Sequence, residues 1–173
     1  MSRPPDPATA RLFLALWPDD ATRAALARCR DAWTWGPNAR PQPDPKLHLT
    51  LHFLGDVAVE AMAGLGAALP RFGAGFELAF GRAAVWSNGV AALEPGDAVP
   101  ALSSLHERIG GALASCSIAV EARAFRPHVT LARRAHGSTP PAAPARIGWR
   151  VDRYVLVQSL PGTGRYVVLA GFD

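Results

Sequence analysis

Two short segments of the sequence repeat the same alternation of a histidine and a threonine. "HLTL" at residues 48–51 returns as "HVTL" at residues 128–131. Side chains of a β-strand alternate between its two faces, so the histidine and threonine of each copy are expected to share one face. The leucines and the valine between and after them point the other way, toward a core. The repeat therefore predicts two strands that each present an imidazole beside a hydroxyl group.

Two imidazoles and two hydroxyls in one cleft would be suited to acid–base chemistry. Histidine has an ordinary pKa of about 6.5, so one ring can be neutral and the other protonated near neutral pH. The neutral ring can accept a proton from water while the protonated ring gives one to a leaving oxygen. The threonine hydroxyls can donate hydrogen bonds to an oxyanion. If the two strands face each other, we expect His48, Thr50, His128 and Thr130 to hydrolyse a phosphodiester without a metal.

The elements that must position these residues can be predicted from hydrophobic periodicity and from turn residues. We expect strands at 11–18, 48–55, 76–86, 90–95, 118–134 (interrupted by Pro127), 153–160 and 165–172, and helices at 19–33, 59–72 and 99–115. Loops are expected at 36–45 and 135–145. This order predicts an α+β protein whose second half echoes its first. Residues 1–10 are proline-rich and are expected to form a flexible leader before a single domain at 11–173.

Composition narrows the class of protein. Of 18 basic residues only Lys46 is a lysine, and arginine-rich surfaces suit phosphate or nucleic-acid ligands, although a bias in overall composition explains the excess equally well. Cys29 and Cys116 show no CxxC spacing, which predicts reduced thiols in a cytoplasmic protein. No apolar run approaches the roughly 20 residues of a membrane span. No Walker-type or KxDG motif occurs, so nucleotidyl transfer through a lysine is not expected. We expect a monomer.

The chain resembles a known family. With the two HxTx motifs, the segments "RLFLALWP" (11–18) and "LVQSLPGTGRY" (156–166) are similar to the two-histidine (2H) phosphoesterases, and to the LigT-like RNA 2′,3′-cyclic phosphodiesterases, historically named 2′-5′ RNA ligases. The resemblance implies a bilobal fold of two pseudo-symmetric halves, each with an antiparallel sheet and outer helices, around a central catalytic cleft. It implies hydrolysis of RNA-terminal or small-nucleotide 2′,3′-cyclic phosphates to 2′-phosphates, without a cofactor and possible in reverse as ligation.

The resemblance also implies roles for individual residues. His48 would be the proton donor to the leaving 3′ oxygen, His128 the proton acceptor from water, and Thr50 and Thr130 would hold phosphate oxygens. Arg133 would add positive charge, although strict alternation places it on the face opposite His128 unless the strand ends or twists there. Three further residues are predicted contacts. His52, where related sequences often carry lysine, either touches the substrate or lies at the rim of the cleft. Ser159 and Tyr166 either contact the substrate or pack in the last hairpin.

Other interpretations remain open at this point. The same site could hydrolyse another small cyclic phosphate, such as ADP-ribose 1″,2″-cyclic phosphate, or the chain could be a non-catalytic module that binds RNA ends. A zinc site of the HExxH kind is not expected at His48 and His52, because the glutamate is missing and the context is a strand. His106 and His136 are predicted to face solvent, Phe13 and Trp17 to be core residues, and Trp35 to be a candidate for stacking on a base.

Overall fold

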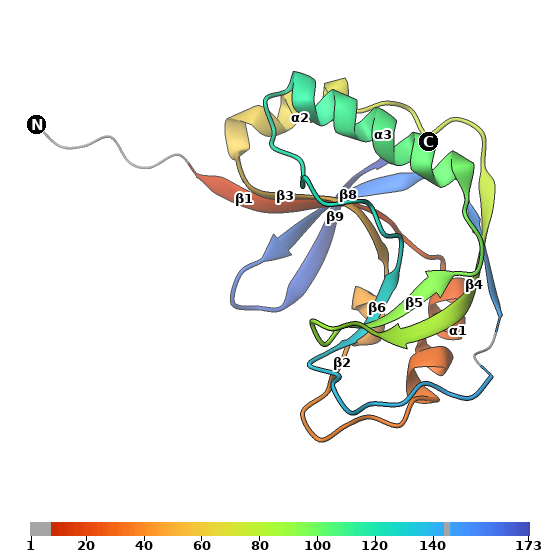
Figure 1. Cartoon of the computed structure of the whole chain (residues 1–173). Coiled ribbons are helices and arrows are strands. Elements are labelled where there is room, and N and C mark those ends of the chain that lie inside the picture. Colours follow the sequence, from red (N-terminus) through yellow and green to blue (C-terminus); the bar gives the residue numbers. More distant parts are fainter. Residues whose placement is uncertain (1–7, 144–145) are drawn as a thin grey trace, which may run out of the picture.

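The computed structural model describes residues 8–143 and 146–173 and shows an α+β fold, as the sequence predicts (Figure 1). Its strands are β1 (Thr9–Leu16), β2 (Arg40–Pro41), β3 (Leu49–Ala58), β4 (Phe76–Val85), β5 (Ala91–Pro95), β6 (Val129–Arg133), β7 (Ile147–Val151), β8 (Tyr154–Leu160) and β9 (Arg165–Phe172). Its helices are α1 (Asp20–Asp31), α2 (Met62–Ala68) and α3 (Pro100–Ser115), with 3₁₀ turns η1 (Asp44–Lys46) and η2 (Val59–Ala61). Within the described residues all strands form one antiparallel sheet.

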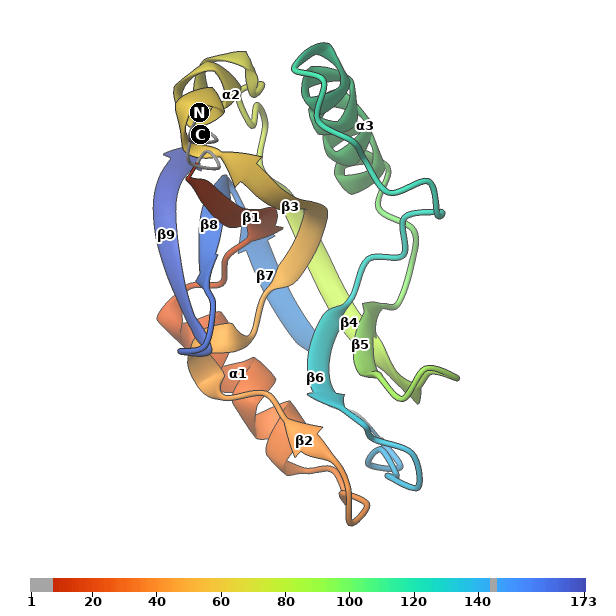
Figure 2. The ribbon, with the colours of Figure 1, turned by 90° about the vertical axis from the view of Figure 1, so that its left-hand side faces the viewer.

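The sheet consists of two parts that meet at the histidine–threonine motifs. Its order is β7-β4-β5-β6-β3-β1-β8-β9, with the short β2 paired to β6 off this path. β3 and β6 are joined at a single residue pair, Leu49 with Val129, and diverge beyond it (Figure 2). Figures 1 and 2 place α2 and α3 together toward one end of the molecule and α1 toward the other. The middle of the sheet is therefore the place where both motifs come together.

Strand β1 is buried on both faces and separates two hydrophobic clusters. Leu12, Leu14 and Leu16 belong to the main core, whereas Phe13 and Ala15 form a smaller cluster with residues of β8. This alternation follows the period of two along a strand. Because β1 pairs with β3, the smaller cluster lies next to the first motif. Both faces of β1 thus support the strand that carries His48.

Local signals explain helix α1. Asp19 caps its N-terminus by accepting a hydrogen bond of 2.7 Å from the backbone N–H of Thr22. Asp20 lies in the first turn, and Arg28 and Arg30 lie in the last, where each charge interacts favourably with the helix dipole.

No helix among the described residues is long and apolar enough to cross a membrane.

Several predicted boundaries differ from the structure. The expected strand at 118–134 is reduced to β6, because Pro127 has no N–H to donate and the preceding residues are largely exposed. The expected helix at 59–72 is shortened to η2 and α2, which contains Gly64 and Gly66. Strand β7 follows the predicted loop and was not expected, although its alternation of buried and exposed residues is a strand signal.

The expected flexible leader at 1–10 overlaps the sheet at its end. Thr9 and Ala10 already belong to β1, where they pair with Ala58 and Val57. Residues 1–7 lie outside the described residues.

Candidate active site

The pairing of Leu49 with Val129 brings the two motifs onto one face of the sheet. Both residues are fully buried and anchor their strands. Extending this antiparallel register by one residue places His48 opposite Thr130, and Thr50 opposite His128. The two copies of the motif therefore lie side by side in antiparallel order.

A cavity of about 220 Å³ lies on this face and brings together most of the predicted site residues. Its lining includes seven of the eight residues predicted to contact substrate, namely His48, Thr50, His128, Thr130, Arg133, Ser159 and Tyr166. Arg133 reaches the cavity despite the alternation argument, because the pairing of β6 with β5 shifts register between Thr130 and Ala132, where Leu131 and Ala132 are both buried in the core. The cavity also contains five residues that were not predicted to line it. From the sequence, Arg11, Gln42 and Phe53 have no predicted role, Lys46 stands out only as the single lysine, and Phe13 is predicted only as a core residue.

Both motif histidines are held in the same way through their Nδ1 atoms. His48 Nδ1 donates to the backbone carbonyl of Lys46 at 2.7 Å, and His128 Nδ1 donates to that of Arg126 at 2.8 Å. A carbonyl only accepts, so each Nδ1 carries a hydrogen and each Nε2 is left for proton transfer. His48 Nε2 also lies 3.1 Å from the Thr50 hydroxyl. A basic residue two places before each histidine is thus part of the repeat, a signal present in "KLHLT" and "RPHVT".

Aromatic side chains enclose both imidazoles. Phe13 and Trp17 stack against His48 with ring centroids 5.0 and 5.5 Å away, and Tyr166 meets it edge-on at 5.6 Å. Trp86 lies against His128 at 4.4 Å in a tilted arrangement. Phe13 is buried as predicted and also contacts the site, while Trp17 is only half-buried.

This environment lowers the pKa of both histidines in the ligand-free protein. Burial lowers the pKa of His48 to about 4, against the opposing effect of its bond to the Lys46 carbonyl, and the positive charges of Arg23, His128 and Arg133 lower it further. Burial also lowers the pKa of His128, where the bond to the Arg126 carbonyl and the charge of Glu94 act in the opposite direction. An anion bound beside either ring would act in the opposite direction and raise its pKa.

Arg23 on α1 positions the chain that leads into the first motif. Its guanidinium donates to the carbonyls of Asp44 at 2.9 Å, Leu47 at 3.0 Å and Pro18 at 3.2 Å, and it lies over the Trp17 ring. Sequence reasoning missed this residue because a lone arginine on a helix carries no pattern. The contacts with Asp44 and Leu47 join segments that are more than 20 positions apart along the chain.

His52 lines a second cavity instead of the first. It is buried, and its Nε2 donates to the carbonyl of His106 at 2.9 Å. The His106 ring is stacked between His52 and Phe125, with centroids 4.0 and 3.9 Å away. The prediction that His106 faces solvent is therefore wrong, because the ring is half-buried in this stack and burial lowers its pKa to about 4.

The other aromatic and histidine predictions have mixed outcomes. His136 is exposed, as expected. Trp35 stacks on Trp33 at 5.0 Å and is in the lining of neither cavity beside the motifs, and its stacking on a base stays a prediction.

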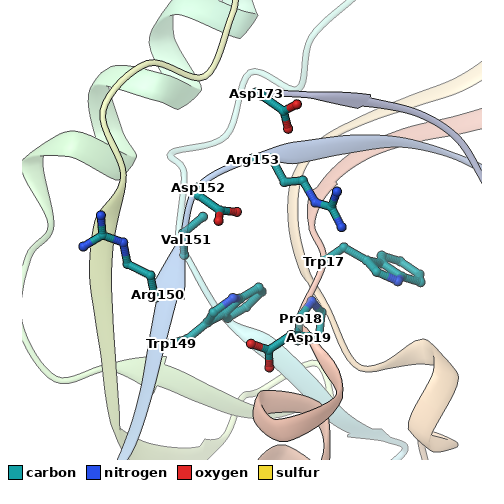
Figure 3. A pocket seen from close by; sticks show the side chains of 9 residues that line it. All are labelled: Trp17, Pro18, Asp19, Trp149, Arg150, Val151, Asp152, Arg153 and Asp173. Atoms are coloured by element: carbon teal, nitrogen blue, oxygen red, sulfur yellow. The ribbon is translucent and has the colours of Figure 1, made fainter.

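The second cavity adjoins the first across the motif residues. It has a volume of about 440 Å³ and shares Thr50, Phe53, His128, Thr130 and Arg133 with the smaller one. A separate cavity of about 410 Å³ lies behind Trp17, between the start of α1 and the turn after β7 (Figure 3). It contains none of the predicted site residues. Among residues 8–143 and 146–173 no three His, Cys, Asp or Glu side chains gather closely enough to hold a metal ion.

Comparisons with known proteins agree with this geometry. Residues 17–163 match the family model of the 2′-5′ RNA ligase superfamily. A crystal structure described as a phosphoesterase is 27% identical, with a TM-score of 0.85 over 95% of this chain and 98% of its own. Escherichia coli LigT in complex with 3′-AMP is 28% identical, with a TM-score of 0.85 over the same shares of the two chains. A protein of Thermus thermophilus is 28% identical, with a TM-score of 0.68 over 94% of this chain and 96% of its own.

A comparison with curated protein sequences found no significant match. The family match covers most of the chain and includes both HxTx motifs, and the structural likeness to LigT extends over nearly its whole length. The resemblance inferred from the motifs is confirmed. The chain belongs to the 2′-5′ RNA ligase superfamily of two-histidine phosphoesterases.

Proposed function

We propose that this protein hydrolyses a 2′,3′-cyclic phosphodiester, at an RNA end or in a small nucleotide, to a 2′-phosphate without a metal. The observation that carries the proposal is the pair of histidines on one cavity, each with Nδ1 bonded to a carbonyl and Nε2 left for proton transfer. Related LigT structures support a nucleotide ligand, since they hold 3′-AMP, NADP⁺, ATP or phosphate. RNA ends and small cyclic nucleotides are the proposed partners.

In the proposed reaction the cyclic phosphate sits between the two imidazoles. The hydroxyls of Thr50 and Thr130 donate to its oxygens, and the guanidinium of Arg133 balances their charge. His128 Nε2 takes a proton from water while the water oxygen forms a bond to phosphorus. The bond from phosphorus to the 3′ oxygen breaks, and His48 Nε2–H gives its proton to that oxygen. One water is consumed, and the products are a 2′-phosphate and a 3′-hydroxyl. If the 5′-hydroxyl of a second RNA end attacks in place of water, the same steps leave the two ends joined by a 2′-5′ linkage and a free 3′-hydroxyl.

We propose that residues 11–173 form one catalytic domain with two lobes. The part of the sheet that contains β3 supplies one motif, and the part that contains β6 supplies the other. The cleft between the lobes would hold the phosphate, so neither lobe alone would be active. Ser159 contributes to the same cavity from the end of β8.

The proposed activity can be tested with a nucleoside 2′,3′-cyclic phosphate in excess EDTA, with the product identified by phosphorus NMR. We expect a 2′-phosphate from the unaltered protein and from His136→Ala, and losses of about 10²–10⁴-fold in His48→Ala and in His128→Ala. Near-normal turnover by either motif variant would refute the two-histidine mechanism. Turnover of ADP-ribose 1″,2″-cyclic phosphate alone would change the substrate, and binding of RNA ends without turnover would identify a binding module.

The roles of acid and base need a separate test, because the lower pKa of His48 in the ligand-free protein would suit a base equally well. A phosphodiester whose leaving group departs as a stable nitrophenolate needs no general acid. With this substrate we expect His48→Ala to keep most of its activity and His128→Ala to lose it. The opposite pattern would exchange the two roles.

A further inference from the structure

Lys46 and Arg126 occupy equivalent positions in the two copies of the motif. Each lies two residues before a motif histidine and accepts a hydrogen bond from its Nδ1 through the backbone carbonyl. Each also places its cation over an aromatic ring. The Lys46 ammonium lies 5.0 Å from the centre of the Tyr166 ring, and the Arg126 guanidinium lies 4.2 Å from that of Trp86. Both rings hold the cations at the cavities beside the motif histidines, Lys46 in the lining of the smaller cavity and Arg126 in that of the larger one.

The two cations differ in their electrostatic partners. Arg126 forms an ion pair with Glu94, whose side chain is buried. Over the described part of the chain no carboxylate lies within ion-pair distance of Lys46. The acidic residue nearest to it in sequence, Asp44, binds Arg30 at 2.6 Å instead. One of two equivalent positions is therefore neutralised and the other is not.

The two cavities also differ in whether their positively charged residues are paired with carboxylates. The smaller cavity is lined by Lys46, Arg11 and Arg133, and among residues 8–143 and 146–173 no aspartate or glutamate is in its lining. Arg11 is held over the Phe53 ring at 4.8 Å. In the larger cavity Arg123 is paired with Glu121, and Arg126 with Glu94. The excess positive charge thus lies on the Lys46 side, and the aromatic side chains Trp86 and Phe125 lie on the other side.

On the basis of the hydrolytic function proposed above, we propose that Lys46 and Arg11 form a second phosphate subsite. It would take a phosphate attached to the 5′ side of the nucleotide whose 2′,3′-cyclic phosphate lies between the histidines. A terminal RNA nucleotide carries such a phosphate, whereas a nucleoside 2′,3′-cyclic phosphate with a free 5′-hydroxyl does not. Charge-assisted hydrogen bonds from ammonium and guanidinium groups to phosphate are among the strong ones in proteins. The preferred substrate class is therefore an RNA end or a 5′-phosphorylated cyclic nucleotide.

The test compares two substrates that differ only in the 5′-phosphate. For the unaltered protein we expect kcat/KM to be about 10–100-fold higher for the 5′-phosphorylated cyclic nucleotide, and this ratio to shrink with added salt. The ratio should fall to near one in Lys46→Met and in Arg11→Met, and Lys46→Arg should retain it. Arg153→Met, which removes an exposed arginine outside both cavities, is the matched control.

Each outcome decides the proposal. Equal kcat/KM for the two substrates in the unaltered protein would refute the second subsite while leaving the hydrolysis itself intact. A Lys46→Met protein that loses both substrates in the same proportion would also refute it, since the side chain would then act through His48. Hydrolysis of neither substrate would refute the proposed function. If ADP-ribose 1″,2″-cyclic phosphate loses its rate in Lys46→Met and a short RNA does not, the second phosphate comes from a pyrophosphate and not from an RNA chain.

Discussion

Binding of an anion at the cavity should change the protonation of His48. In the ligand-free protein burial lowers its pKa to about 4, so near neutral pH the ring has no proton to give. One negative charge about 4–5 Å from the ring contributes roughly 3–4 kcal/mol at an effective dielectric constant of about 20. That energy corresponds to a rise of roughly 2–3 pH units in pKa. We therefore expect the bound anion to bring the pKa of His48 to about 6–7, where a general acid is effective.

The sign of the pH dependence follows from linkage. Because the anion raises the pKa, its binding takes up a proton between the free and the bound value, and its affinity must increase as the pH falls through this window. Sulfate is a suitable probe because its charge stays constant there. We expect its affinity to rise by up to about tenfold for each pH unit between about pH 7 and 4.5. Isothermal titration calorimetry in buffers of different ionisation enthalpy measures both the affinity and the proton uptake.

The contributions of the two histidines can be separated. His48→Gln should remove most of the pH dependence of sulfate binding, and NMR signals of the His136 ring, which lies outside both cavities, should not respond to sulfate. Sulfate affinity that is independent of pH would refute the coupling between the anion and the histidine. Full pH dependence in His48→Gln would place the proton on His128 and exchange the acid and base.

Three further predictions concern residues around the site. Arg23→Met removes three hydrogen bonds to the segments before α1 and before the first motif, so we expect kcat to fall about 10–100-fold. Arg28→Met is the control and should keep its kcat. A normal kcat in Arg23→Met would contradict the positioning role of Arg23. His52→Lys buries an ammonium and is expected to lower the free energy of unfolding in urea by about 2–4 kcal/mol with little change in KM, whereas a raised KM at unchanged stability would indicate substrate contact. Acid should destabilise the fold, because the pKa of about 4 for His48 and His106 in the folded chain lies below the value of about 6.5 in the unfolded chain. Stability is full above this window and is lost as the pH falls through it, by up to about 3 kcal/mol for His48 and less for the partly exposed His106; urea unfolding across this range should show a smaller loss in His106→Phe, and an identical loss would refute the assignment.

The spacing of residues within each motif predicts the local geometry of the site without reference to the rest of the fold. A histidine and a threonine two positions apart in a strand must share a face, and the apolar residues between them must anchor that strand, because strand periodicity is a local property. The repetition of this pattern in the second half predicted two equivalent groups of side chains. The basic residue two places before each histidine was also present in the sequence, although its role as the carbonyl partner could be recognised only in the structure.

How the two motifs meet, and which residues surround them, depends on the tertiary structure. The pairing of Leu49 with Val129 joins segments 80 positions apart, and no local pattern specifies that register. The position of Arg133 in the cavity depends on the register shift within β6, against the prediction from alternation. The low pKa of His48 and the ion pair that neutralises Arg126 but not Lys46 likewise depend on distant residues. The burial of a group and its electrostatic interactions depend on all of its neighbours in space, and the order of residues along one strand does not specify those neighbours.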